Sequence, residues 1–269
     1  MGYWGTPTAD MDFCEPNYAV THFVAEFWNM LTSIPILLVG VSGVWLSKRQ
    51  DLGPEQMAAY STVGLIGLGS LIFHATLMRT GQVLDEVPML WAALVLLYVM
   101  RHHVKDRVLR RSKGRRAAAG NSHVLLLGMG IYAAAATGAY FMLGFVYFVV
   151  AYALSILGLF LLAVHATMAS EPPMGPQARR MVLSAGAVYG GGFALLWLPG
   201  EVLCHSVPLM QRLPMHALFH LTSAAGPHLG LTAFALARFD DEAETVARCS
   251  WPFAGLPAID RSAALHKVV

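Results

Sequence analysis

Long runs of apolar residues dominate the chain, and short stretches between them carry most of its charge. A bilayer core of roughly 30 Å takes about 20 helical residues, which is close to the length of most runs. The run over 124–164 is twice that length, so we expect it to bend near 138–145, where glycines occur. The pattern therefore predicts seven helices from runs at 27–46, 58–78, 83–100, 124–164, 181–198 and 214–237.

Composition places these helices in a membrane. Hydrophobic residues make up 56% of the chain and charged residues 13%, whereas a soluble domain carries about 25% charged residues. Backbone groups in lipid must be paired within helices or a closed barrel, and continuous apolar runs exclude the alternation of a barrel. We predict an all-α membrane protein, a seven-transmembrane helix bundle over 27–237, with a metal-binding segment at 1–26 and a tail at 238–269.

Basic residues give the expected orientation. Of the 18 Lys and Arg residues, all but Arg79 and Arg212 lie in the tail or in the loops on the same side of the membrane. Basic loops stay in the cytosol. We therefore expect the N-terminus to be lumenal or extracellular and the C-terminus to be cytosolic.

Several polar residues interrupt the apolar runs at one depth, near the lumenal end. Ser70 and His74 are four residues apart, as are His216 and His220, so each pair shares a helix face, and Asp85 begins the third run. Ionisable groups within membranes are costly and usually functional. Three neutral imidazoles at one level can bind zinc and leave a fourth position open. The depth and spacing predict a zinc site with Asp85 as general base and Ser70 as an oxyanion donor.

Some histidines have a simpler interpretation than metal binding. A lone membrane histidine more often bonds a backbone carbonyl or a serine than a metal, which is the interpretation for His165 and His228. The motif HALFH lacks the glutamate of the HExxH protease motif.

A cluster of oxygen-bearing side chains precedes the first apolar run. Such closely spaced carboxylate and amide oxygens suit calcium, although a solvated acidic loop fits the same spacing. The residues are Asp10, Asp12, Glu15, Asn17 and Glu26.

The cysteines leave two possibilities open. Cys14 and Cys204 both fall on the expected oxidising side, and Cys249 falls in the cytosolic tail. Spacing alone fits a disulfide or two free thiols equally well.

Several motifs together resemble the alkaline ceramidase family of seven-helix membrane amidases. They are GYWGTPTADMDFCEPNY, AEFWN, GSLIFHATL, QVLDEVPML with LLY, and HALFH. The resemblance covers almost the whole chain in order. It implies hydrolysis of a ceramide-type lipid to a sphingoid base and a fatty acid, in the membrane of the endoplasmic reticulum or Golgi. No nucleic-acid partner is expected, and oligomeric state is left open.

The resemblance also assigns residues. It implies that His74, His216 and His220 bind zinc and that Ser70 and Asp85 are catalytic. It implies a calcium loop whose ligands are Asp12, Phe13 through its backbone carbonyl, Glu15, Asn17 and Glu26. It also implies a lumenal disulfide between Cys14 and Cys204.

Two departures and one rival family follow from the same comparison. The family commonly has tryptophan where Phe13 stands, and LWLPGEVLCH departs from the family's usual acidic and amide residues before the cysteine. That second departure puts the packing of the sixth helix in question.

Progestin and adiponectin receptors share the serine, aspartate and three histidines, but their usual topology has a cytosolic N-terminus. A transporter has little support.

Overall fold

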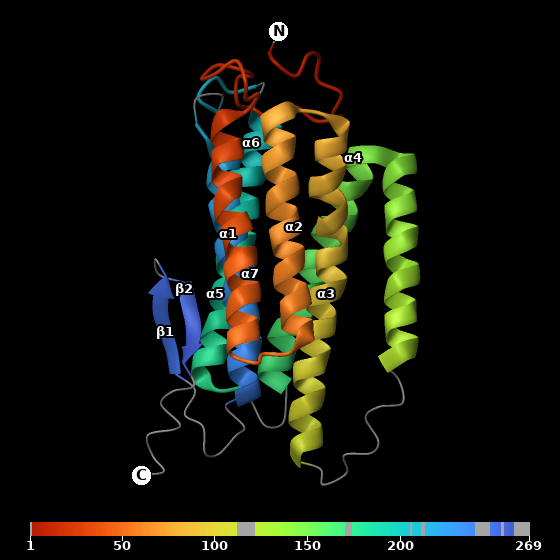
Figure 1. Cartoon of the computed structure of the whole chain (residues 1–269), viewed down its shortest axis with the longest axis vertical. Helices are drawn as coiled ribbons and strands as arrows, with labels where there is room; N and C mark the ends of the chain where they lie inside the picture. Colours follow the sequence, from red (N-terminus) through yellow and green to blue (C-terminus); the bar gives the residue numbers. More distant parts are fainter. Residues whose placement is uncertain are drawn as a thin grey trace.

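The computed structural model is a helical bundle with the N-terminal segment lying across one end (Figure 1). It describes residues 2–111, 122–169, 174–204, 206–210, 213–239, 248–253 and 256–260. The elements in chain order are α1 (Phe27–Arg49), α2 (Pro54–Thr76), α3 (Arg79–Arg111), α4 (Ser122–Ala169), α5 (Pro176–Gly192), η2 (Phe193–Trp197), α6 (Leu198–Leu203), α7 (Met215–Phe239), β1 (Arg248–Phe253) and β2 (Leu256–Asp260).

Small residues let α1, α2 and α3 approach one another closely. A Cβ on Gly40 of α1 would overlap the backbone of Gly64 on α2, and a Cβ on Gly69 would overlap the backbone of Leu84 and Asp85 on α3. Such contacts are typical of helices packed in lipid, where association depends on van der Waals contact. The second contact places the residue before Ser70 directly against Asp85.

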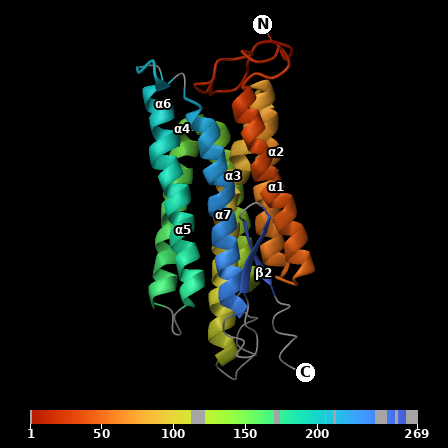
Figure 2. The ribbon, with the colours of Figure 1, turned by 90° about the vertical axis from the view of Figure 1, so that its left-hand side faces the viewer.

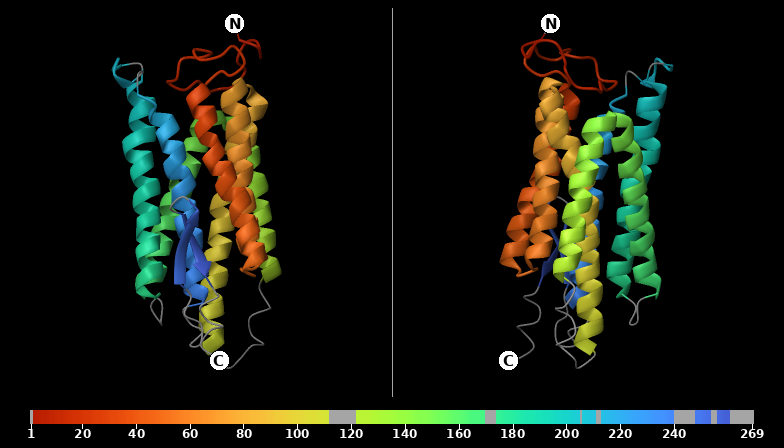
Figure 3. Two further views of the ribbon diagram at one scale, coloured as in Figure 1. Left: turned by 60° about the vertical axis from the view of Figure 1, so that its left-hand side comes forward. Right: turned by 90° about the vertical axis from the view of Figure 1, so that its right-hand side faces the viewer.

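Helix α4 is broken at Gly144, within the stretch where a bend was predicted. Gly144 has φ 70° and ψ −155°, a conformation that a side chain would disfavour. The chain turns back there at the end of the bundle that carries the N-terminal segment, and the two arms run side by side (Figures 1 and 3). The predicted bend is confirmed.

Five of the described helical segments are long and apolar enough to cross a membrane. They are Phe27–Arg49, Pro54–Thr76, Arg79–Arg101, His123–Met168 and Pro176–Leu203. The multi-pass helical architecture agrees with the sequence. The count of seven crossings and the direction of the termini stay predictions, and many of the basic residues behind that direction, within 112–121 and much of the tail, lie outside the described residues.

The rod formed by α5, η2 and α6 contains a turn that the sequence did not reveal. At η2 the Leu198 N–H donates to the Phe193 carbonyl, five residues back, which makes a π turn. Pro199 follows directly and has no N–H to donate. The rod stands beside α7 at one side of the bundle (Figure 2).

The tail departs from the all-α prediction. Strands β1 and β2 form an antiparallel two-stranded hairpin after α7. Period-two patterning over so few residues, in a segment assigned to the tail, was too short a signal to predict it.

Candidate metal centre

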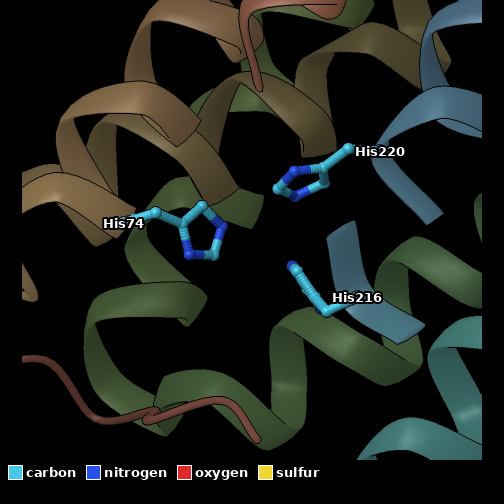
Figure 4. Close-up of side chains that lie close together, drawn as sticks. All are labelled: His74, His216 and His220. Atoms are coloured by element: carbon cyan, nitrogen blue, oxygen red, sulfur yellow. The ribbon is translucent and has the colours of Figure 1, made fainter. Parts of the chain in front are cut away.

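Three buried histidines face one another near the end of the bundle covered by the N-terminal segment (Figure 4). His74 comes from the last turn of α2, and His216 and His220 come from the first two turns of α7. The ring centroids are 5.1 Å apart for His74 and His216, 5.0 Å for His74 and His220, and 4.7 Å for His216 and His220. The structure brings together the three residues that the sequence predicted.

Each ring has its Nδ1 atom directed at a protein acceptor. Nδ1 of His74 lies 2.5 Å from Oε2 of Glu26, and Nδ1 of His220 lies 3.1 Å from the Asn29 carbonyl oxygen. Nδ1 of His216 lies 3.4 Å from Oε1 of Glu201. Metal-binding histidines usually donate their second ring N–H to a carboxylate or a carbonyl in this way.

The remaining ring nitrogens fit a metal. Nε2 of His74 is buried with no hydrogen-bond partner among the described residues, a costly condition for a polar atom in an apolar setting. One ligand atom from each of the three histidines can be chosen so that all lie within 4.8 Å of one another. In the described part of the chain no other group of three or more His, Cys, Asp or Glu residues meets that test.

A largely apolar cavity of about 550 Å³ reaches this centre, and its wall includes His216, His220, Ser70, Asp85 and Glu86. The neighbouring carboxylates differ in their contacts. Oε1 of Glu86 accepts from Gln82 and Oε2 accepts from the Tyr140 hydroxyl at 2.6 Å. Both Glu86 oxygens are therefore engaged, which leaves Asp85 as the better candidate for a mobile proton.

Ser70 has a partner that the sequence did not suggest. Its hydroxyl lies 2.9 Å from the hydroxyl of Ser33 on α1, and both side chains are buried. The Ser33 hydroxyl also lies 2.9 Å from the Asn29 carbonyl oxygen, to which it donates. Because Ser33 uses its proton on the Asn29 carbonyl, the Ser70 hydroxyl is the donor within the serine pair. The Ser70 hydroxyl can therefore turn to another acceptor that enters the cavity.

The predicted calcium residues contact either the start of α1 or one another. Oε1 and Oε2 of Glu15 accept from the backbone N–H groups of Trp28 and Asn29 at 2.7 and 2.9 Å. Asn17 donates to both oxygens of Asp12 at 3.0 Å. Glu15 thus satisfies two of the donors left open at the start of a helix.

Like charges crowd this segment. Burial raises the pKa of Glu26 to about 7, and the Asp12 carboxylate adds to the rise, while the Asn29 amide, His216 and the Phe13 N–H oppose it. Burial also raises the pKa of Glu15, with backbone N–H groups opposing and Glu26 adding to the rise. The raised pKa values of both groups come mainly from burial, with repulsion between neighbouring carboxylates as a smaller cause. Asp10 instead pairs with Arg79.

A disulfide joins Cys14 to Cys204, with Cα atoms 5.7 Å apart. It connects the N-terminal segment to the end of α6. The residue before Cys14 is Phe13, whose ring lies 3.8 Å from that of His216 between centroids. The bond therefore holds the segment against the histidine centre.

Glu201, whose carboxylate faces His216, was not among the residues predicted from the sequence. A signal was present, because Glu201 is the only Asp, Glu, Lys or Arg residue between positions 181 and 211.

The separate interpretation of His228 agrees with the structure in that it has a protein partner: its Nδ1 lies 3.0 Å from the Tyr60 hydroxyl.

Comparison with known proteins gives the family. A family model described as Ceramidase matches residues 5–260. Alkaline ceramidase 3 of Mus musculus is 40% identical over 99 residues, which is 37% of each chain. Alkaline ceramidase YPC1 of Saccharomyces cerevisiae is 32% identical over 108 residues, covering 40% of this chain and 34% of that protein. Each match spans less than half of the relative's length. The family model covers nearly the whole chain, and the chain belongs to the ceramidase family.

Proposed function

We propose that this protein is a zinc-dependent membrane amidase that hydrolyses a ceramide-type lipid to a sphingoid base and a free fatty acid. The observation that carries the proposal is the buried histidine centre at the wall of an apolar cavity that also presents Asp85 and Ser70. The relatives named alkaline ceramidase support the choice of lipid.

The Nε2 atoms of His74, His216 and His220 would hold the zinc ion, because each Nδ1 already faces a protein acceptor. When bound, zinc makes a water molecule more acidic and polarises the amide carbonyl. Three neutral imidazoles leave a position open for this chemistry, as in catalytic rather than structural zinc sites.

The proton transfers fall to Asp85. Asp85 takes a proton from the attacking water and delivers it to the amide nitrogen as the C–N bond breaks, so the amine leaves in neutral form. The water oxygen forms the new bond to the acyl carbon, which completes the carboxylic acid. Ser70 turns its hydroxyl from Ser33 toward the oxygen that becomes negative and stabilises it.

The cavity accounts for the substrate class. Its wall is mainly aromatic and aliphatic, with side chains such as Phe148, Tyr152 and Phe219. Burial of apolar surface is worth roughly 0.8 kcal/mol per methylene, so alkyl chains gain most of their binding energy here. The ionisable groups Asp85, Glu86, His216 and His220 line the part of the wall near the histidine centre, where the amide would lie.

The N-terminal segment would bind calcium and keep the centre covered. Asp12, Glu15, Asn17, Glu26 and the carbonyl oxygen of Phe13 would supply oxygen ligands, the donors that calcium prefers. The proposal also includes seven crossings, with the N-terminus in the lumen and the C-terminus in the cytosol. We place the protein in the endoplasmic reticulum or Golgi membrane. The disulfide supports an oxidising environment for this end of the bundle.

The decisive experiment is hydrolysis by the full chain purified in detergent. We expect release of fatty acid from fluorescent ceramides, loss of activity after zinc removal, and recovery when zinc is restored. A receptor of the related superfamily would bind a ligand without turnover. Absence of hydrolysis across ceramides of several chain lengths, in protein shown to contain zinc, would overturn the enzyme proposal.

A further inference from the structure

The rod formed by α5, η2 and α6 carries one acidic residue, whose role is not explained by the proposed reaction. Glu201 lies in an otherwise uncharged stretch, and its side chain is only 10% exposed. A buried charge within a membrane protein is expensive unless it has a partner or a function. The nearest ionisable partner described is His216.

Local backbone structure aims Glu201 at α7. The π turn over Phe193–Trp197 and the following Pro199 change which face of the rod the next residues present. Gly200 then allows close approach, because a Cβ there would lie 3.0 Å from the Cβ of Met215. The residue after Gly200 meets the residue after Met215, and these are Glu201 and His216.

The facing atoms both lack a closer partner. Oε1 of Glu201 and Nδ1 of His216 are buried without a hydrogen bond among the described residues. Their separation of 3.4 Å exceeds the usual N–H···O distance by about 0.5 Å. A hydrogen bond between these two atoms would satisfy both of them at once.

We propose that Glu201 is a positioning residue for His216: it accepts the Nδ1–H, fixes that tautomer and keeps Nε2 directed at the metal. The inference rests on the proposed metal site. The Phe13 ring packs against His216 with 3.8 Å between centroids, so ring packing and a carboxylate together fix the imidazole. Glu26 has the equivalent relation to His74.

Charge balance gives a second reason. Three neutral imidazoles leave the two positive charges of a zinc ion uncompensated in a low-dielectric setting, where charge interactions are strong. Glu201 and Glu26 each supply a nearby negative charge through a different histidine. Glu201 thus positions a metal ligand and balances charge in this chain, even though the stretch around it departs from the family pattern.

The test measures zinc affinity directly, using zinc alone as the probe and a competing chelator to buffer it. The proteins are the full-length wild type, Glu201→Gln, Glu201→Ala and the control Val202→Ala, whose side chain is on the same turn but 64% exposed. Loss of a carboxylate that orients a metal-bound histidine typically weakens binding about 10- to 100-fold. We expect that loss in Glu201→Ala, a smaller loss in Glu201→Gln, whose amide oxygen can still accept, and none in the control.

The melting temperature of the zinc-free protein separates positioning from general support of the fold. A positioning role predicts that Glu201→Gln melts close to wild type without zinc but gains less stability when zinc is added. Wild-type zinc affinity in Glu201→Gln and Glu201→Ala would overturn the inference, as would an equal loss in Val202→Ala. If Glu201→Ala does not fold, unchanged affinity in Glu201→Gln overturns it alone. A wild-type protein that binds no zinc would instead overturn the metal centre itself.

Discussion

Glu26 and His74 make the contact that joins the N-terminal segment to the histidine centre. Oε2 of Glu26 lies 2.5 Å from Nδ1 of His74, while Oε1 accepts the Phe13 N–H at 2.9 Å. The backbone adds a second connection, because the Glu26 N–H donates to the His74 carbonyl at 2.9 Å. Displacement of this segment therefore disturbs a candidate metal ligand directly.

Calcium removal should lower both stability and turnover. Without a cation, the carboxylates of Asp12, Glu15 and Glu26 repel one another. Displacement of the Glu26 side chain would then disturb its contact with Nδ1 of His74. Excess EGTA should reduce the melting temperature and the rate, with zinc content measured in parallel and zinc restored if needed. Recovery with calcium but not magnesium is the control. An unchanged melting temperature and rate in calcium-free, zinc-loaded protein would contradict the calcium site.

His216→Ala should fold, lose bound zinc and lose turnover. The substitution removes one of three ligands, and the remaining pair cannot complete the site. The matched control is His228→Ala, which removes a buried histidine of the same helix that contacts Tyr60 instead. Elemental analysis of both purified variants checks the prediction, and full zinc content in His216→Ala would refute the ligand assignment.

Asp85→Asn should keep zinc and lose almost all turnover, because asparagine cannot shuttle a proton. Glu86→Gln is the comparison, since Glu86 is held by Gln82 and Tyr140. Its main effect should be on stability. Turnover of a fluorescent ceramide distinguishes the two, and a nearly normal rate in Asp85→Asn beside an inactive Glu86→Gln would show that the carboxylates are assigned the wrong way round.

Ser70→Ala should reduce turnover roughly 100- to 1000-fold, the usual effect of losing one oxyanion donor. The KM should change little, because the lost interaction strengthens only as charge develops. Ser33→Ala removes the partner hydroxyl 2.9 Å away and should cost less. Equal losses in both variants would argue that the serine pair supports the packing of α1 on α2 instead.

Replacement of Cys14 and Cys204 by serine should destabilise the protein by about 2–4 kcal/mol, typical for a native disulfide. Thermal unfolding with and without reductant checks this. The wild type should lose stability on reduction, whereas the double variant should not respond. Cys249→Ser, which leaves the bond intact, should behave as the wild type does. A wild type that is insensitive to complete reduction would oppose a stabilising role.

The histidine centre could be predicted from the sequence because the position of each histidine in its apolar run gives its depth in the membrane and its helix face. His216 and His220 share a face by their spacing, and His74 lies four residues before the end of its run, at the same level. The bend at Gly144 was also within reach, since the run is too long for one crossing. Recognition of the family, rather than spacing, indicated that Cys14 pairs with Cys204.

The partners around the centre could not be predicted in the same way. Ser33 contacts Ser70 on α2, and Asn29 contacts His220 on α7, in both cases from α1. Neither contact joins residues close in the sequence, so neither has a local pattern. Glu201 carried a signal as an isolated charge, but its direction depends on the π turn at η2. Helical periodicity alone would place Glu201 on a different face, because it assumes an uninterrupted α-helix.

Order of synthesis gives the Cys14–Cys204 bond a further consequence. The two cysteines are 190 residues apart, and a ribosome adds roughly 5–20 residues per second. The N-terminal segment therefore waits on the order of 10–40 s after its own synthesis before its partner cysteine exists. Two of the three histidines emerge later still, on α7. An incomplete chain consequently cannot assemble the centre, so the three histidines come together only among the final events in the biogenesis of this protein.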